Sequence, residues 1–527
     1  MRGHNIAPAE SAFPPLLTLP APGYAQRDPG PGEGRCDMSV RFPDEPSFQG
    51  RFAPVRLEGD IRGVEVTQGE IPASLRGTFY RVGADPAWPP FVDRDFYFNA
   101  DGMVAMFRFE NGYCDFRSRY VRTPRFEAER AARRSLFGAY RNPFTDDPSV
   151  AGLSRGLANT NVYWHGGRLL ASKEDSAPVQ IDPDTLDTVG EFTWDGDLSS
   201  QTATAHPKID PRTGELVFFG YMAKGEATRD IAYYEADANG RIVHEAWFEA
   251  PYSSMVHDWA VTENFVVFPI IPLTASLERL KAGGPLYVWD GSADVYLGVV
   301  PRKGTAVRWY RGTNRFASHI MNAFDDGRHI HIDTPVGEKS AFPWFPDITG
   351  APFDPEKASA QLSRWTIDTT APPDRGDGTT SFAQRRLTDC SGEFPRTDDR
   401  WATRGYRFGV INLTGVPGEK PDDGLPGFRW LGQIDPDTGT MKTRFAGRDS
   451  TVQEAIFVPP SGTDTANGEG YVMQLVDRHA TGTTDLLILD AQHVDGEPVA
   501  TLRIPIRMPG GLHGNWVTAQ QLANRAG

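Results

Sequence analysis

The chain has 527 residues, of which 39% are hydrophobic and 11% aromatic, so it can bury a sizeable core. Its formal net charge is −15 at pH 7 and its pI is near 5.3, which argues against nucleic acid and anionic membranes as partners, because both attract basic surfaces. Glycine (54) and proline (43) are too frequent for a mainly helical protein, so we expect short strands joined by many turns.

Residues 1–45 are rich in proline and glycine without periodicity, which predicts a disordered leader, and we expect 46–527 to form a single catalytic domain. No secretory signal is visible, and the most apolar internal run, "FVVFPIIPL" at 265–273, is far shorter than a membrane span of roughly 20 residues. The isolated cysteines Cys36, Cys114 and Cys390 offer no disulfide framework. We therefore predict a cytoplasmic protein without stable membrane association, either a monomer or a homodimer.

One type of turn recurs along the chain, as "IDPDTL" from Ile181, "IDPRTGE" from Ile209 and "IDPDTGT" from Ile434. Proline presets φ and the aspartate accepts backbone hydrogen bonds, so each segment suits a tight turn between strands. Many hairpins over more than 450 residues, with no linker between them, favour an all-β propeller over stacked sandwiches. The repeats are too degenerate to count blades.

Three segments have helical composition. They are 125–140, which we expect to end at Gly138, 274–284, which we expect to begin after Thr274, and 354–365. We expect these insertions and their loops to form a cap over one face of the sheet-built body, where functional loops usually lie.

Four of the eleven histidines stand at the edge of small or apolar strand-like segments: His206 in "TATAHPKID", His257 in "SSMVHDWAV", His319 in "RFASHIMNAF" and His513 in "GGLHGNWV". The first two intervals, 51 and 62 residues, are close to one propeller blade of roughly 40 to 50 residues. Inner strands of a propeller face its axis, so these side chains can meet there. Four neutral imidazoles suit a first-row transition metal, although spacing alone leaves four unrelated core histidines as the alternative.

These segments, together with "FYRVGADP", "YFNADGMVAMFRFENG", "GEFPRTDDR" and "EAIFVPP", resemble the carotenoid cleavage oxygenase superfamily over roughly residues 75–527. The resemblance implies a seven-bladed propeller that holds one Fe(2+) per chain through His206, His257, His319 and His513. It also implies that Glu174, Glu393 and Glu454 hold the N–H groups of the ligand histidines. The implied reaction cleaves an alkene into two carbonyl compounds with O2 as co-substrate.

Within this superfamily the local sequence is similar to the lignostilbene-type dioxygenases, which implies a phenolic alkene as substrate and two aromatic aldehydes as products. The phenol-binding roles fall on Tyr140 in "FGAYRNPFTDD" and Lys173 in "ASKEDS", and Phe98 would pack on the ring. The likeness places Thr160 near the oxygen site and assigns the other ring to Ser318 and Phe342.

Lys173 and Glu174 are neighbours, and neighbours in an extended strand point to opposite faces, so we expect Lys173 to be unpaired in the cavity. Its removal would then change stability by less than about 1 kcal/mol. Two alternatives stay open: a carotenoid or apocarotenoid cleavage oxygenase with the same iron centre, and a non-catalytic propeller that binds protein partners.

Overall fold

The structure is a computed structural model that describes residues 40–526 except 94, 374–379, 419–426 and 461–467. The leader predicted for 1–45 lies largely outside the described residues, and residues 40–45 form no helix or strand. The division into a leader and one domain stays a prediction.

The described strands form seven antiparallel blades. The first blade consists of β1 (Gly59–Ile61), β5 (Tyr113–Tyr120), β4 (Gly102–Glu110), β3 (Gly77–Ala84) and β32 (Gly511–Thr518). The second consists of β6 (Asn161–His165), β7 (Arg168–Ser172), β8 (Val179–Ile181) and β9 (Thr188–Glu191). The third consists of β10 (Lys208–Ile209), β11 (Leu216–Tyr221), β12 (Asp230–Ala236) and β13 (Ile242–Glu249). The fourth consists of β14 (Ala260–Val261), β15 (Phe265–Ile270), β18 (Val295–Pro301) and β19 (Arg308–Gly312).

One eight-stranded path of sheet contains the next two blades. The fifth has β20 (Phe316–Ala317), β21 (Asn322–Asp325), β22 (His329–Gly337) and β23 (Gln361–Asp368), and the sixth has β25 (Gly409–Gly415), β26 (Trp430–Ile434) and β27 (Met441–Phe445). The strand β24 (Ala383–Thr397) serves both, because its first half pairs with β23 and its second half, from Ser391, pairs with β25. The seventh blade has β28 (Ser450–Val458), β29 (Tyr471–Arg478), β30 (Thr483–Asp490), β31 (Ala500–Ile504) and β2 (Glu65–Gly69).

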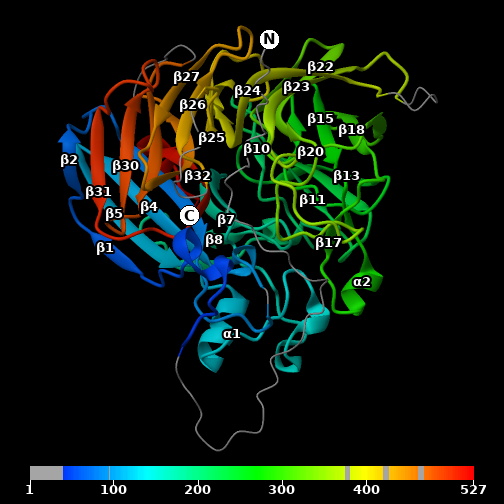
Figure 1. Cartoon of the computed structure of the whole chain (residues 1–527), viewed down its shortest axis with the longest axis horizontal. Helices are drawn as coiled ribbons and strands as arrows, with labels where there is room; N and C mark the ends of the chain where they lie inside the picture. The colour runs from blue at the N-terminus through cyan, green and yellow to red at the C-terminus, as the bar shows by residue number, and fades with distance from the viewer. Residues whose placement is uncertain (1–39, 94, 374–379, 419–426, 461–467, 527) are drawn as a thin grey trace, which may run out of the picture.

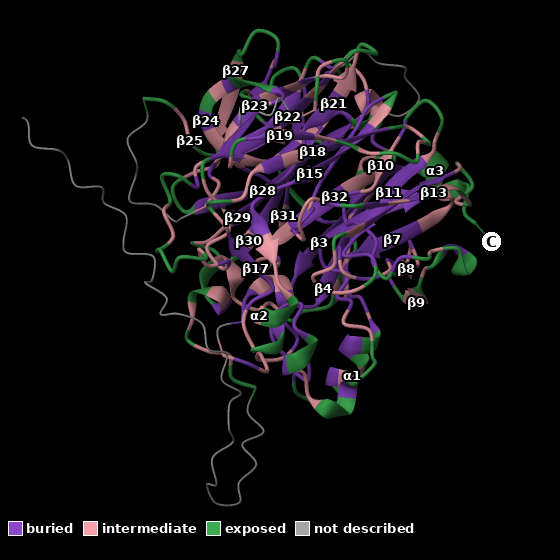
Figure 2. Ribbon diagram, turned by 90° about the vertical axis from the view of Figure 1, so that its right-hand side faces the viewer, coloured by how far each residue is buried: buried purple, intermediate pink, exposed green. Residues whose placement is uncertain are grey.

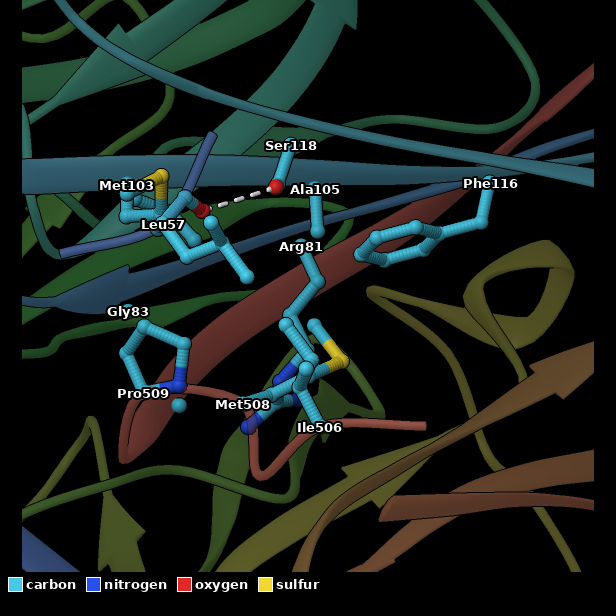
Figure 3. A pocket seen from close by; sticks show the side chains of 12 residues that line it. Leu57, Arg81, Gly83, Met103, Ala105, Phe116, Ser118, Ile506, Met508 and Pro509 are labelled. Atoms are coloured by element: carbon cyan, nitrogen blue, oxygen red, sulfur yellow. Dashed lines mark hydrogen bonds between the residues drawn. The ribbon is translucent and has the colours of Figure 1, made fainter. Parts of the chain in front are cut away.

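Both ends of the described chain close the ring. The C-terminal β32 pairs with β3, and the N-terminal β2 pairs with β31. Arg81 of β3 reinforces this closure, since its guanidinium donates to the carbonyl oxygens of Glu454 and Leu512, each at 3.5 Å. Figure 3 shows Arg81 in the small cavity at this junction, beside Met508 and Ile506.

Seven hydrophobic clusters fill the interfaces between successive blades, one for each interface of a closed ring. The cluster between the first and seventh blades, for example, packs Phe79 and Phe107 against Leu475 and Leu486, all fully buried. Figure 2 shows the strands largely buried and the turns exposed. Every blade therefore depends on both neighbours for its core, as expected of a propeller.

The aspartates of the recurring turns accept backbone hydrogen bonds, as the sequence predicts. Asp182 Oδ1 accepts from the amide of Asp184 at 2.8 Å, Asp210 Oδ1 from that of Arg212 at 3.0 Å, and Asp435 Oδ1 from that of Asp437 at 3.1 Å. These turns connect β8 to β9, β10 to β11 and β26 to β27.

Helix α1 (Pro124–Ala132) begins at the predicted place, but it ends at Ala132, before Arg133 with φ 55°, and not at Gly138. Helix α2 (Leu277–Lys281) is capped by Ser276, because Thr274 belongs to the hairpin of β16 (Leu273–Ala275) and β17 (Tyr287–Trp289). The predicted helix at 354–365 is wrong, since β23 occupies Gln361–Asp368. Pairing with both β22 and β24 outweighs its helical composition.

The remaining helices are short: α3 (Ala519–Ala523) and the 3-10 turns Pro46–Phe48, Gly50–Phe52, Tyr97–Asn99, Pro143–Thr145, Pro148–Val150, Trp194–Gly196 and Asp399–Trp401. Figures 1 and 2 both show α1 and α2 on the same side of the blades, as predicted for insertions that cover one face. Among the described residues, none of these helices has the length and apolar character to cross a membrane.

Candidate active site

The four histidines singled out in the sequence meet in space. His206 precedes β10, His257 precedes β14, His319 lies between β20 and β21, and His513 lies on β32. One ligand nitrogen from each lies within 4.8 Å of the others. The Nε2 atoms of His206 and His257 are 3.2 Å apart, and those of His257 and His319 are 3.1 Å apart. Four blades thus contribute one imidazole each to a common point.

Hydrogen bonds to the backbone fix the segments that carry these histidines. Trp259 Nε1 donates to the carbonyl oxygen of His206 at 2.9 Å, and Thr334 Oγ1 donates to that of His319 at 2.8 Å. Asp258 Oδ2 accepts the amide of Ile320 at 2.8 Å, which ties the His257 segment to the His319 segment. The ligand positions are therefore set by the blades before any ion binds.

Three buried glutamates orient three of the imidazoles. The Nδ1–H groups of His257 and His319 donate to Glu174 and Glu393, each at 2.5 Å, and that of His513 donates to Glu454 at 2.8 Å. A proton on Nδ1 leaves Nε2 as the free lone pair, so each glutamate fixes the tautomer that a metal needs.

His206 differs from the other three. Its Nδ1 lies 4.0 Å from Asp258 Oδ1, beyond hydrogen-bond distance, and that carboxylate binds Lys208 Nζ at 2.7 Å. The three glutamates are the ones that the family resemblance implies.

Burial favours the neutral form of two of these imidazoles, whereas Glu393 raises the pKa of His319. Burial and the neighbouring histidines hold the pKa of His206 well below its ordinary value, and burial lowers the pKa of His513 to about 4 although Glu454 opposes it. Burial alone would raise the pKa of Glu174, but His257, Arg141 and Tyr221 lower it to about 2. Neutral imidazoles backed by carboxylates are the donor set that a divalent first-row metal requires, so the residues fit Fe(2+).

The two proposed phenol-binding residues lie together beside this centre. Lys173 Nζ is 4.8 Å from the centroid of the Tyr140 ring, and both side chains are buried. The expectation that Lys173 is unpaired is wrong: it forms an ion pair with Asp175, whose side chain is only 6% exposed. The strand β7 ends at Ser172 and residues 174–175 form a turn, so the alternation of an extended strand does not hold here.

Phe98 and Phe342 form part of an aromatic wall next to this pair. The Phe98 centroid lies 6.5 Å from that of Tyr140 and 5.7 Å from that of Phe342, edge to face. Ser318 Oγ is 3.5 Å from His319 Nδ1. The carbonyl oxygen of Thr160 accepts the amide of His513 at 3.1 Å. Ser318 and Thr160 therefore adjoin ligand histidines, and Phe98 and Phe342 adjoin Tyr140, while the roles of all four in binding stay predictions.

Sequence reasoning missed three residues of this site. Asp175 sits two positions after Lys173, and this i, i+2 spacing was its only signal. Tyr221 Oη donates to Glu174 Oε1 at 2.7 Å. Tyr221 lies in the apolar run "LVFFGY", and such a run predicts a core strand without a functional hydroxyl. Arg141 donates to the hydroxyls of Tyr221 and Tyr287 at 2.8 and 2.9 Å, and only its place beside Tyr140 pointed to it.

A cavity of about 570 Å³ reaches His206, His319 and His513 along the inner strands. Charged groups such as Asp258 and Arg396 line it, and it extends to the exposed Gln521 at the start of α3. The metal centre is thus in contact with a space that both charged and apolar side chains line.

Fold and site together define a seven-bladed propeller that holds a metal ion through four histidines. The sequence profile of the family described as "Retinal pigment epithelial membrane protein" matches residues 52–518. The chain belongs to this family, so the superfamily and the double-bond-cleaving oxygenase class expected from the motifs are confirmed.

The similar proteins include enzymes named for phenolic alkenes. Lignostilbene-alpha,beta-dioxygenase isozyme III of Sphingomonas paucimobilis is 46% identical over 92% of this chain and 99% of that protein. Isoeugenol monooxygenase of Pseudomonas nitroreducens is 44% identical over 90% of this chain and 98% of that protein. The crystal structure of Pseudomonas brassicacearum lignostilbene dioxygenase superposes with a TM-score of 0.86 and 42% identity, covering 91% of this chain and all of that chain.

Proposed function

We propose that the protein is a non-haem Fe(2+) dioxygenase that cleaves the central double bond of hydroxylated stilbenes to give two aromatic aldehydes. The observation that carries this proposal is the buried pair of Lys173 and Tyr140 beside the four-histidine centre. A hydrocarbon polyene has no polar group that could bind a lysine ammonium and a tyrosine hydroxyl, whereas a phenol has one. The similarity to a lignostilbene dioxygenase supports the same substrate class.

The proposed phenol site provides one neutral and one charged hydrogen-bond donor. Burial raises the pKa of Tyr140 well above its ordinary value, so its hydroxyl stays protonated and can donate to the substrate oxygen. Burial lowers the pKa of Lys173, and Asp175 opposes that effect. An ammonium and a hydroxyl around a phenol oxygen stabilise the phenolate, which pushes electron density through the ring onto the alkene.

The chain's own residues have defined tasks in this reaction. Tyr140 and Lys173 hold the phenol oxygen, Phe98 packs on the ring, and Thr160 lies near the position of the oxygen molecule. Ser318 and Phe342 contact the second ring. The four imidazoles, oriented by Glu174, Glu393 and Glu454, hold Fe(2+), which when bound supplies the activation of O2.

A propenyl phenol such as isoeugenol is the second candidate substrate, because a relative named for it is nearly as similar as the one named for lignostilbene. Both substrates present a phenol conjugated to an alkene, so they would use the same Lys173–Tyr140 pair and differ only beyond the double bond. The edge-to-face pair of Phe316 and Phe342 favours a second ring there.

Product analysis tests the proposal. Iron-loaded protein would be incubated in air with 4-hydroxystilbene, isoeugenol and an apocarotenoid, and the carbonyl products identified by mass spectrometry. We expect 4-hydroxybenzaldehyde and benzaldehyde from the stilbene, at a rate above that of the other two. Cleavage of the apocarotenoid alone would contradict the stilbenoid assignment. A protein that takes up no iron during loading and cleaves none of the three compounds would favour a binding scaffold.

We also propose that the enzyme acts in the cytoplasm as a monomer or a homodimer. Cys114 and Cys390, which are buried free thiols, agree with a reducing compartment. Cell fractionation and light scattering of the purified protein test the two statements.

A further inference from the structure

Asp175 contacts Lys173, but it has no task in the proposed reaction. One of its carboxylate oxygens pairs with Lys173 Nζ, and the other, Oδ1, is buried without a hydrogen-bond partner among the described residues. Its side chain is 6% exposed and that of Lys173 is 4% exposed. A buried carboxylate oxygen without a donor is costly and therefore calls for an explanation.

The other charged groups around the pair have partners of their own. Arg141 binds Glu226 at 3.0 Å as well as the hydroxyls of Tyr221 and Tyr287. Glu174 accepts hydrogen bonds from His257 and Tyr221. Asp175 is consequently the carboxylate that balances Lys173, and the neutral hydroxyl of Tyr140 completes the set of titratable groups that face the pair.

A bound phenolate would change this balance. Lys173 and Asp175 together carry no net charge, so a phenolate added beside them leaves one uncompensated negative charge in a buried site. That charge disappears if Asp175 takes up a proton, because Lys173 then balances the phenolate. The phenol carries the proton that is needed.

We propose that Asp175 is the positioning residue that receives the proton of the substrate phenol through Lys173, and that it thereby makes the pocket select neutral phenols over anions. The inference rests on the proposed function and deepens it. In the step, the Lys173 ammonium gives one proton to Asp175 Oδ2, with which it is paired, the resulting amine takes the phenol proton, and the phenol O–H bond breaks. The products are a phenolate, an ammonium and a neutral carboxylic acid, so protons and charge balance without an added base.

Selectivity follows from the same balance. A phenol brings its own proton for Asp175, whereas a carboxylate arrives at neutral pH without one and must recruit a proton from water. Removal of the Asp175 charge abolishes this penalty, because an anion can then pair with Lys173 directly. We therefore expect Asp175→Asn to favour an anionic ligand over the neutral phenol, relative to wild type, by about tenfold or more, which is the effect of one pKa unit.

The test measures anaerobic binding to the iron-loaded full-length protein at pH 6.5. The ligands are 4-hydroxystilbene and stilbene-4-carboxylate, followed by fluorescence, and the absorption of the bound phenol reports whether it is ionised. Asp485→Asn is the matched control, because Asp485 is a buried carboxylate, 3% exposed, that pairs with Arg478 and Arg503 on the seventh blade. We expect the ratio of the two dissociation constants to shift in Asp175→Asn and to stay unchanged in Asp485→Asn.

A measurement on wild type keeps the inference testable if the variant does not fold. Binding of 4-hydroxystilbene should produce the red-shifted phenolate absorption while a pH indicator in weak buffer detects almost no released proton. Release of about one proton per bound phenolate would overturn the inference, as would an unchanged ratio in Asp175→Asn. Wild type that binds phenolate but cleaves nothing in air would overturn the proposed function and leave the role of Asp175 standing.

Discussion

Replacement of Lys173 by methionine tests the buried ion pair most sharply. Lys173→Met keeps most of the length of the side chain but leaves Asp175, 6% exposed, without its cation. Loss of one partner of a buried pair costs about 3–5 kcal/mol. Protonation of the carboxyl sets a ceiling: for an ordinary aspartate of pKa about 3.9, neutralisation at pH 7 costs about 4 kcal/mol. We therefore expect a loss of about 3–4 kcal/mol, several times what an unpaired lysine would give.

The loss should depend on pH. The folded variant holds a proton on the stranded carboxyl while the unfolded chain releases it above about pH 4, so stability falls as the pH rises through this range. The stability that Lys173→Met loses relative to wild type should decrease by about 1.4 kcal/mol for each pH unit below pH 7. At about 2 cal/mol/K per residue, a chain of this size has an unfolding entropy near 1 kcal/mol/K, so the Tm at pH 7 should fall by about 3–4 °C.

Calorimetry of wild type, Lys173→Met and Lys173→Met/Asp175→Asn at pH 5.5 and 7.5 measures these effects. The double variant should recover most of the lost stability, because it removes the stranded charge. The reasoning would be refuted if Lys173→Met lost the same stability at both pH values, or if Lys173→Met/Asp175→Asn were no more stable than Lys173→Met.

Three further predictions concern the metal centre. Glu454→Gln should weaken iron binding by about 10–100-fold in competition with a chelator, because His513 loses its orienting carboxylate, and unchanged affinity would count against that role. Tyr221→Phe removes the donor to Glu174 and should lower stability by about 1.5–3 kcal/mol in denaturant titration; a change below about 0.5 kcal/mol would show that the bond contributes little. His257→Ala should purify with the propeller fold by circular dichroism but without stoichiometric iron, and full iron content by metal analysis would remove His257 from the ligand set.

The sequence predicts the metal centre well because each ligand histidine stands in a short motif on or next to a strand. The intervals of 51 and 62 residues match blades, and the resemblance supplies Glu174 and Glu454, which the structure finds at their histidines. The partner of Lys173 could not be predicted, because it depends on the chain turning at residues 174–175.

Errors arise where long-range pairing decides the local structure. The segment 354–365 has the composition of a helix, but β22 and β24 draw its second half into a strand. Tyr221 reads as one more apolar core residue, and only the approach of the second blade to the third brings its hydroxyl to Glu174. Such contacts between distant segments leave no periodic signal in the sequence.

The central claim is that a phenol held by Lys173 and Tyr140 activates the alkene for cleavage at the four-histidine iron. The most direct measurement is the rate at which iron-loaded protein cleaves 4-hydroxystilbene compared with its methyl ether, which has the same alkene but cannot form a phenolate. We predict that the hydroxystilbene is cleaved at least about 100-fold faster, on the order of one transition-state charge stabiliser. Equal rates for the two compounds would contradict the account.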